Sequence, residues 1–105
     1  MSWLEYLPLL AATLAIELAV IEIARKVRPP APRRSDILWV NLATHPLAYL
    51  LIGWNPSAFL LVEVLVTIAE GAGYRWLNPQ LPLAKALVLS AIANGITAFI
   101  GWMMV

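Results

Sequence analysis

Long apolar stretches alternate along the chain with short polar connections that contain proline. No formally charged residue occurs between Asp36 and Glu63, and none follows Lys85. A helix that crosses the hydrocarbon core of a bilayer needs about 20 mostly apolar residues, and each stretch is close to that length. Proline has no backbone N–H and rarely continues a helix, so the prolines mark the connections. The pattern predicts four membrane-spanning helices, over residues 7–27, 37–54, 57–77 and 82–104.

Basic residues concentrate in the connections at one end of the predicted bundle. Five of the seven Lys and Arg residues fall within residues 25–34, and the other two, Arg75 and Lys85, flank the last connection. Short loops rich in Lys and Arg stay in the cytoplasm, so both basic loops are predicted to be cytoplasmic and both termini to lie outside. Ser35 and Asp36 are suited to cap the start of the second helix. Tryptophans gather at membrane interfaces, and those near predicted helix ends are Trp3, Trp39, Trp54, Trp76 and Trp102.

Composition points to the same class of protein. Hydrophobic residues make up 62% of the chain and charged residues only 12%, whereas a soluble domain is roughly 25% charged. The chain has no cysteine, which excludes disulfides, iron–sulfur clusters and thiolate metal sites. We expect an all-α integral membrane protein, a single domain over residues 1–105 that forms a four-transmembrane-helix bundle. Two alternatives stay open: residues 37–54 could be re-entrant, which leaves three spans, or a partner could hold the basic loop outside.

The apolar helices contain polar residues that fall on one face of each helix. Glu63, Thr67, Glu70 and Tyr74 are spaced at i, i+4, i+7 and i+11, so they share a face. An ionised carboxylate near the middle of a bilayer costs on the order of 3 kcal/mol or more. Because polar side chains avoid lipid, we expect these faces to converge on the bundle interior. The other helices contribute Thr13, Glu17, Asn41, Thr44, His45, Ser90, Asn94, Thr97 and Gly101.

These residue types suggest an intramembrane site for a cation. Burial favours a neutral carboxyl group, and a neutral Glu beside an imidazole is suited to proton transfer. Carboxylates, one imidazole and Asn oxygens could instead ligate a divalent metal ion. The candidate ion or proton ligands are Glu63, His45, Glu70 and Glu17, supported by Asn41, Thr44, Ser90 and Asn94. Counting residues from the helix ends gives Glu63 and His45 similar depths, so we expect that pair to do the chemistry and Glu70 to be more structural.

The two halves of the chain match each other when shifted by 53 residues. The scarce polar and proline residues that coincide are Glu17 with Glu70, Pro29 with Pro82, Asn41 with Asn94, and Thr44 with Thr97. The match suggests two parallel hairpins related by a pseudo-two-fold axis along the membrane normal. Coincidence among repeated helix–Pro–helix patterns is the alternative. His45 and Glu63 have no counterpart in the other half.

One motif set resembles a known group of sequences. The segment Asn41–Pro46, then Glu63, Glu70 and Tyr74, then Ser90, Asn94, Thr97 and Gly101 are similar to small bacterial multi-pass membrane proteins with the pattern N-x-x-T-[N/H]-P, E-x6-E-x3-Y and S-x3-N-x2-[S/T]-x3-G. The resemblance implies a multi-pass protein of the bacterial inner membrane. It implies no activity, so it identifies these positions as a set without a mechanism.

Three functional hypotheses follow from the sequence. The first is a small membrane protein that binds or conducts a cation, either a proton or a divalent metal ion. A homo-oligomer or larger membrane complex is then expected, because 105 residues are few for a complete transport pathway. The second is an accessory subunit or assembly factor of a larger membrane complex. The third is an enzyme acting on a lipid-like substrate, for which no nucleophile motif is present, and nothing in the sequence suggests nucleic-acid binding.

Overall fold

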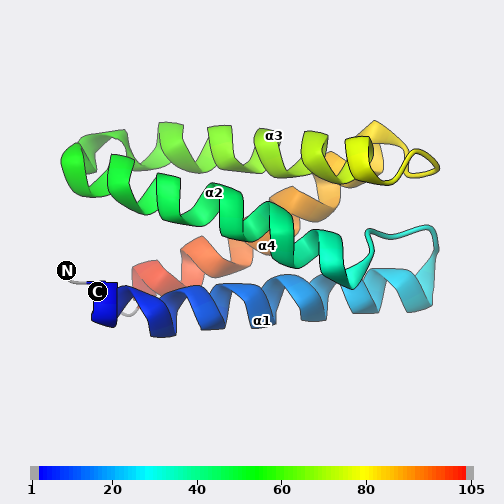
Figure 1. Cartoon of the computed structure of the whole chain (residues 1–105), viewed down its shortest axis with the longest axis horizontal. Helices are drawn as coiled ribbons and strands as arrows, with labels where there is room; N and C mark the ends of the chain where they lie inside the picture. Colours follow the sequence, from blue (N-terminus) through cyan, green and yellow to red (C-terminus); the bar gives the residue numbers. More distant parts are fainter. Residues whose placement is uncertain (1–2, 104–105) are drawn as a thin grey trace.

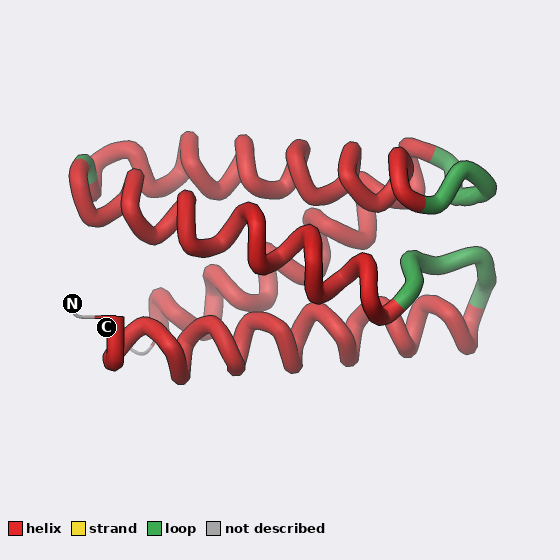
Figure 2. Tube along the Cα trace, viewed as in Figure 1, coloured by secondary structure: helices red, strands yellow, loops and turns green. Residues whose placement is uncertain are grey.

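Four helices form an elongated bundle in the computed structural model, which describes the backbone of residues 3–103 and the side chains of residues 4–100 (Figure 1). The helices are α1 (Trp3–Val27), α2 (Arg34–Trp54), α3 (Phe59–Leu77) and α4 (Leu83–Met103). One turn of 3-10 helix, η1 (Pro56–Ala58), precedes α3. The rest of the described chain consists of short connections and contains no strand (Figure 2).

The bundle has the dimensions of a membrane-spanning unit. Its longest extent is 38 Å, against about 30 Å for the hydrocarbon core of a bilayer. Within residues 3–103, four helical segments are long and apolar enough to cross a membrane: Leu4–Val27, Arg34–Trp54, Pro56–Leu77 and Leu83–Ile100. Both basic connections lie at one end of the bundle, and the chain termini lie at the other (Figure 1).

The helix boundaries differ from the sequence prediction by a few residues. Helix α1 begins at Trp3, whereas the sequence predicted a start at position 7. Pro8 therefore lies inside the helix and not at its first residues. The predicted end at residue 104 lies outside the described residues. Helix α2 begins at Arg34, directly after Arg33, and has no side-chain cap. The expected cap at Ser35–Asp36 is wrong because both residues lie inside the first turn of α2. The Asp36 carboxylate instead accepts hydrogen bonds from Arg33 Nε at 2.8 Å and from Asn78 Nδ2 at 3.2 Å.

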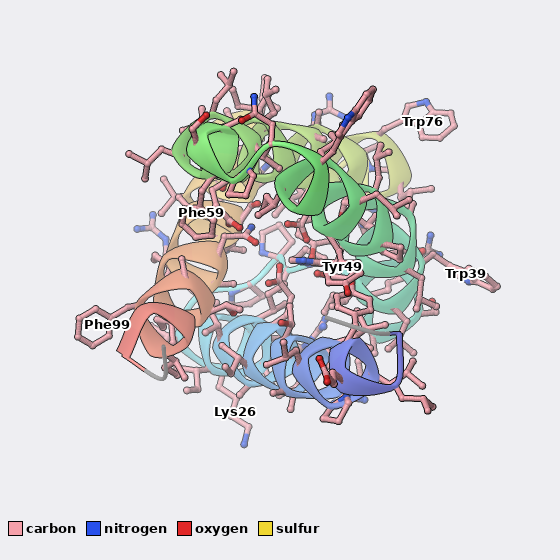
Figure 3. The ribbon with its side chains drawn as sticks, turned by 90° about the vertical axis from the view of Figure 1, so that its left-hand side faces the viewer. Lys26, Trp39, Tyr49, Phe59, Trp76 and Phe99 are labelled. Carbon is pink, nitrogen blue, oxygen red and sulfur yellow. The ribbon has the colours of Figure 1, made fainter. Side chains whose placement is uncertain are left out.

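The outer surface of the bundle is apolar. Trp39 and Trp76 are 70% and 81% exposed, and Phe99 is 58% exposed. A view along the bundle shows these side chains pointing outward, while Tyr49 points toward the axis (Figure 3). Large exposed apolar patches mark surfaces that meet lipid or partners, so this surface suits a lipid environment.

Helices α3 and α4 approach each other closely at Gly71. A Cβ atom added there would lie 2.6 Å from Leu87 Cδ2 and 3.0 Å from Leu87 Cα. Small residues permit such close approach between membrane helices. Helices α3 and α4 share the most extensive helix–helix contact, and among the neighbouring α-helices α1 and α2 share the least. The close approach brings Glu70, the residue before Gly71, against α4.

Candidate functional site

Glu70 lies at the centre of a polar cluster between α3 and α4. Its side chain is fully buried, and its Oε1 accepts a hydrogen bond from Asn94 Nδ2 at 2.7 Å. Asn94 Nδ2 also donates to the Ser90 carbonyl at 2.9 Å, one helical turn earlier. Ser90 Oγ in turn donates to the Thr67 carbonyl at 2.8 Å. Residues of both helices thus hold Glu70 in one position.

His45 approaches the same carboxyl group from α2. Its Nε2 lies 3.7 Å from Glu70 Oε1, which is beyond hydrogen-bond distance but within reach of an ion pair. The side chain is 13% exposed, and Nε2 is buried without a hydrogen-bond partner. An imidazole in this position can exchange a proton with Glu70 after a small side-chain movement.

Glu17 is the second fully buried carboxyl group and belongs to a chain of three side chains. Its Oε1 accepts a hydrogen bond from the Tyr74 hydroxyl at 2.7 Å. The same hydroxyl accepts one from Asn41 Nδ2 at 3.0 Å, and Asn41 Nδ2 also donates to the Ile37 carbonyl at 2.7 Å. Tyr74 therefore links α1 to α2 through α3. Glu17 and Glu70 are close enough to interact electrostatically.

The two clusters match at the 53-residue spacing found in the sequence. Asn41 and Asn94 each donate to the carbonyl four residues earlier, Ile37 and Ser90 respectively. Thr44 and Thr97 do the same with Val40 and Ala93. These paired contacts are consistent with the proposed internal repeat.

Five buried polar atoms of these clusters have no hydrogen-bond partner in the described part of the chain. They are Glu17 Oε2, Asn41 Oδ1, His45 Nε2, Glu70 Oε2 and Asn94 Oδ1. A buried polar group left unsatisfied costs about 1–3 kcal/mol, so such a concentration needs an explanation. The four oxygens are hydrogen-bond acceptors when the carboxyl groups are ionised. What the cluster lacks is therefore positive charge or protons.

Glu63 is less enclosed than Glu17 and Glu70, the other two carboxyl groups on the polar helix faces. It is only half-buried and lines an open groove of about 320 Å³ between α3 and α4. The groove is lined by Leu60, Glu63, Val64, Thr67, Ile68, Ala91, Asn94, Gly95 and Ala98. His45 lies beside Glu70, and no hydrogen bond joins it to Glu63 among the described residues. The rise per residue of a helix places His45 roughly midway in depth between Glu63 and Glu70. Depth along the bundle therefore does not show which of the two carboxyl groups His45 approaches.

The remaining candidates have simpler roles. Ser90 and Asn94 contact Glu70 directly or through each other, as a supporting set should. Thr44 uses its hydroxyl on its own helix, donating to the Val40 carbonyl. Within the residues whose side chains are described, no three His, Asp or Glu side chains are grouped so that they could hold one metal ion.

Tyr74 is the site residue that sequence reasoning underestimated. The sequence placed it on the polar face of its helix but gave it no part among the candidate ligands, whereas its side chain is fully buried and its hydroxyl joins Glu17 to Asn41. The available signal was its spacing, four residues after Glu70 on the same polar face.

Comparison with family models, curated proteins and solved structures finds no match for this chain. The site is therefore interpreted from its own geometry.

Proposed function

We propose that this protein is a multi-pass protein of the bacterial inner membrane that binds and exchanges a proton at Glu70, with His45 as the exchange partner. In this proposal the basic connections face the cytoplasm, as the positive-inside rule requires, and both termini face outward. Glu17 forms a second carboxyl site linked to the first by its electrostatic interaction with Glu70.

The observation that carries the proposal is the incomplete pairing of Glu70 with Asn94. One hydrogen bond joins Asn94 Nδ2 to Glu70 Oε1 at 2.7 Å, while Glu70 Oε2 and Asn94 Oδ1 are buried without a partner. A carboxylic acid and an amide can form two hydrogen bonds side by side, here from Asn94 N–H to the Glu70 carbonyl oxygen and from the Glu70 O–H to the Asn94 carbonyl oxygen. A proton on Glu70 Oε2 supplies the donor that Asn94 Oδ1 lacks, and it removes a buried charge that is expensive in lipid.

His45 gives the proton a route to and from this carboxyl group. Imidazole is the side chain whose ordinary titration falls near neutral pH, and its Nε2 is 3.7 Å from Glu70 Oε1. A proton held by His45 forms an ion pair with ionised Glu70, and a proton held by Glu70 leaves both groups neutral. The two states have the same total charge, which suits exchange inside a membrane.

A divalent metal ion is the second candidate ligand, and the four buried oxygens without partners support it. Glu17 Oε2, Glu70 Oε2, Asn41 Oδ1 and Asn94 Oδ1 are all hard donors of the kind that Ca²⁺, Mg²⁺ and Mn²⁺ prefer. Only two of the four oxygens belong to carboxyl groups, so the site offers less charge than a dedicated divalent site.

Infrared difference spectroscopy of the purified protein in lipid tests the proton proposal. A C=O stretching band of a protonated carboxyl group should be present at neutral pH, shift in D₂O, and disappear in Glu70→Gln. Glu5→Gln, which changes an exposed carboxyl group at the end of α1, should leave the band unchanged. A spectrum without this band would overturn the proposal.

Proton flux into liposomes containing a pH-sensitive dye then separates binding from conduction. Conduction predicts flux that Glu70→Gln and His45→Gln abolish, whereas binding alone predicts the infrared band without flux. Elemental analysis and the effect of added Mn²⁺ on thermal stability test the metal alternative. If the wild-type protein binds a stoichiometric amount of metal and both Glu17→Gln and Glu70→Gln lose it, the ligand of the site is a metal ion and not a proton.

A further inference from the structure

We propose that a hollow at the basic end of the bundle, lined by Arg25, Arg33, Arg34 and Ser35, binds the phosphodiester of an anionic phospholipid headgroup. The hollow has a volume of about 390 Å³ and lies where α1 ends and α2 begins. This inference is separate from the intramembrane carboxyl site. It shares with the proposed function only the condition that the protein lies in a membrane.

The three guanidinium groups are held in place by contacts on one side. Arg34 donates from Nε and Nη2 to Glu22 Oε2, at 3.0 and 2.7 Å. Arg25 donates from Nε to Glu22 Oε1 at 3.0 Å and from Nη2 to the Pro32 carbonyl. Arg33 donates from Nε to Asp36 at 2.8 Å and from Nη2 to the Leu77 carbonyl at 3.2 Å. Each arginine thus has its Nε and Nη2 occupied.

The third nitrogen of each guanidinium group remains available. Among the described residues, Nη1 of Arg25, Arg33 and Arg34 makes no hydrogen bond, so both N–H donors of each Nη1 are left. Ser35 adds a hydroxyl group at the start of α2, where the residue before the helix, Arg33, provides no side-chain cap. The first N–H groups of a helix are unsatisfied and attract anions. Anchored guanidinium groups and helix N–H groups together form a site for phosphate oxygens.

The charge of the hollow matches one phosphodiester. Three arginines are opposed by the two carboxylates that anchor them, Glu22 and Asp36, which leaves one positive charge. A phosphodiester carries one negative charge, so binding neutralises the hollow without adding excess charge. Basic pockets between helices on the cytoplasmic side of membrane proteins are known to hold lipid headgroups.

The position of the hollow favours a lipid over a soluble phosphate. Trp39, near the start of α2, and Trp76, near the end of α3, lie toward the same end of the bundle as the hollow. Both side chains are exposed, and both point outward from the bundle (Figure 3). Tryptophan side chains settle at the level of the headgroups. A phosphate of the surrounding bilayer therefore lies at the depth of the three arginines, and its acyl chains meet the apolar outer surface of the bundle.

Native mass spectrometry of the detergent-solubilised protein tests this site, with dioleoylphosphatidylglycerol and dioleoylphosphatidylcholine as the two added lipids. The wild-type chain should retain phosphatidylglycerol at least tenfold more than phosphatidylcholine, which carries no net charge. Arg25→Gln and Arg33→Gln should each remove most of this preference. Lys26→Gln is the matched control, because it removes the same charge from the same end but Lys26 does not line the hollow.

Three further measurements complete the test. Arg33→Lys keeps the charge but loses the planar fork of donors, so it should also weaken the preference, and its circular dichroism should match wild type. Soluble glycerophosphate in excess should not displace the lipid; displacement would assign the site to a free phosphate. Equal losses in Lys26→Gln and Arg25→Gln, or no preference between the two lipids, would overturn the proposal.

Discussion

The two buried carboxyl groups occupy equivalent positions in the sequence but have different partners. Asn41 follows Glu17 by the same number of residues as Asn94 follows Glu70. Asn94 donates directly to Glu70 at 2.7 Å, whereas the Tyr74 hydroxyl stands between Asn41 and Glu17. The two halves of the chain have therefore built different sites from the same residue types.

The packing of the helices explains this difference. Gly71 lets α3 and α4 approach until a Cβ atom would clash with Leu87, and Asn94 can then reach Glu70 across the interface. The residue that matches Gly71 at the 53-residue spacing is Leu18, a larger side chain, and α1 and α2 make far less contact. Tyr74 of α3 bridges Glu17 and Asn41 in the first half. The residue of α1 that matches Tyr74 at the 53-residue spacing is Ile21, which has no hydroxyl to bridge Glu70 and Asn94.

Replacing Gly71 by leucine, the residue of the other half, should have the largest effect on stability. Its Cβ would meet both the side chain and the backbone of Leu87, and overpacking typically costs about 1–3 kcal/mol, with the larger value expected where backbone must move. Denaturation in mixed detergent micelles measures the loss. Gly53→Leu is the matched control, because nothing lies within 4 Å of a Cβ there; equal losses would show that Gly71 does not set the helix distance.

Glu70→Gln and Glu17→Gln should separate the two carboxyl groups by function. If the protein conducts protons, Glu70→Gln should reduce proton flux at least about 100-fold, which is the lower end of the rate effect expected when a general acid–base group is lost. Glu17→Gln should reduce it less than tenfold, since Glu17 hydrogen-bonds Tyr74 while Glu70 lies beside His45. The reverse order would make Glu17 the exchanging group. Stability should change little in Glu70→Gln, because a glutamine retains an acceptor for Asn94 and adds the missing donor.

Asn94→Ala should destabilise the protein more than Asn41→Ala. Asn94 Nδ2 donates to Glu70 Oε1, and with a proton on Glu70 Oε2 the Asn94 Oδ1 atom accepts a second hydrogen bond. The substitution therefore removes two hydrogen bonds to Glu70, each contributing about 1 kcal/mol. Asn41 Nδ2 donates to a hydroxyl and a carbonyl, for which about 1 kcal/mol is expected. The same micelle denaturation measures both. A loss in Asn94→Ala no larger than in Asn41→Ala would indicate that Asn94 does not form the second hydrogen bond with a protonated Glu70.

Tyr74→Phe should have the smallest effect of the series, a loss of about 1 kcal/mol in the free energy of unfolding. The substitution removes only the hydroxyl that joins Asn41 to Glu17 and keeps the buried ring. Asn41 retains its bond to the Ile37 carbonyl, which limits the loss. In the double variant Tyr74→Phe with Glu17→Ala, the two losses should not add fully, because both substitutions remove the bond between the Tyr74 hydroxyl and Glu17. Additive losses would show that the hydroxyl acts elsewhere.

Much of this molecule follows from the sequence. Helix length, apolar composition and the prolines determine the four helices, and the helical spacing of Glu63, Thr67, Glu70 and Tyr74 determines that they share a face. The prediction that Glu17, Glu70, Asn41 and Asn94 turn inward is matched by their burial. These results depend on local periodicity and on the high cost of polar groups in lipid, which act within one helix.

Only the tertiary structure decided which of these residues meet. His45 Nε2 lies 3.7 Å from Glu70 Oε1, and this distance depends on the rotation of α2 about its axis, which no single helix specifies. Tyr74 became the link between Glu17 and Asn41 because the spacing between helices differs in the two halves. Sequence periodicity fixes which side chains face the interior, but the distances and rotations of packed helices decide which polar atoms find a partner there.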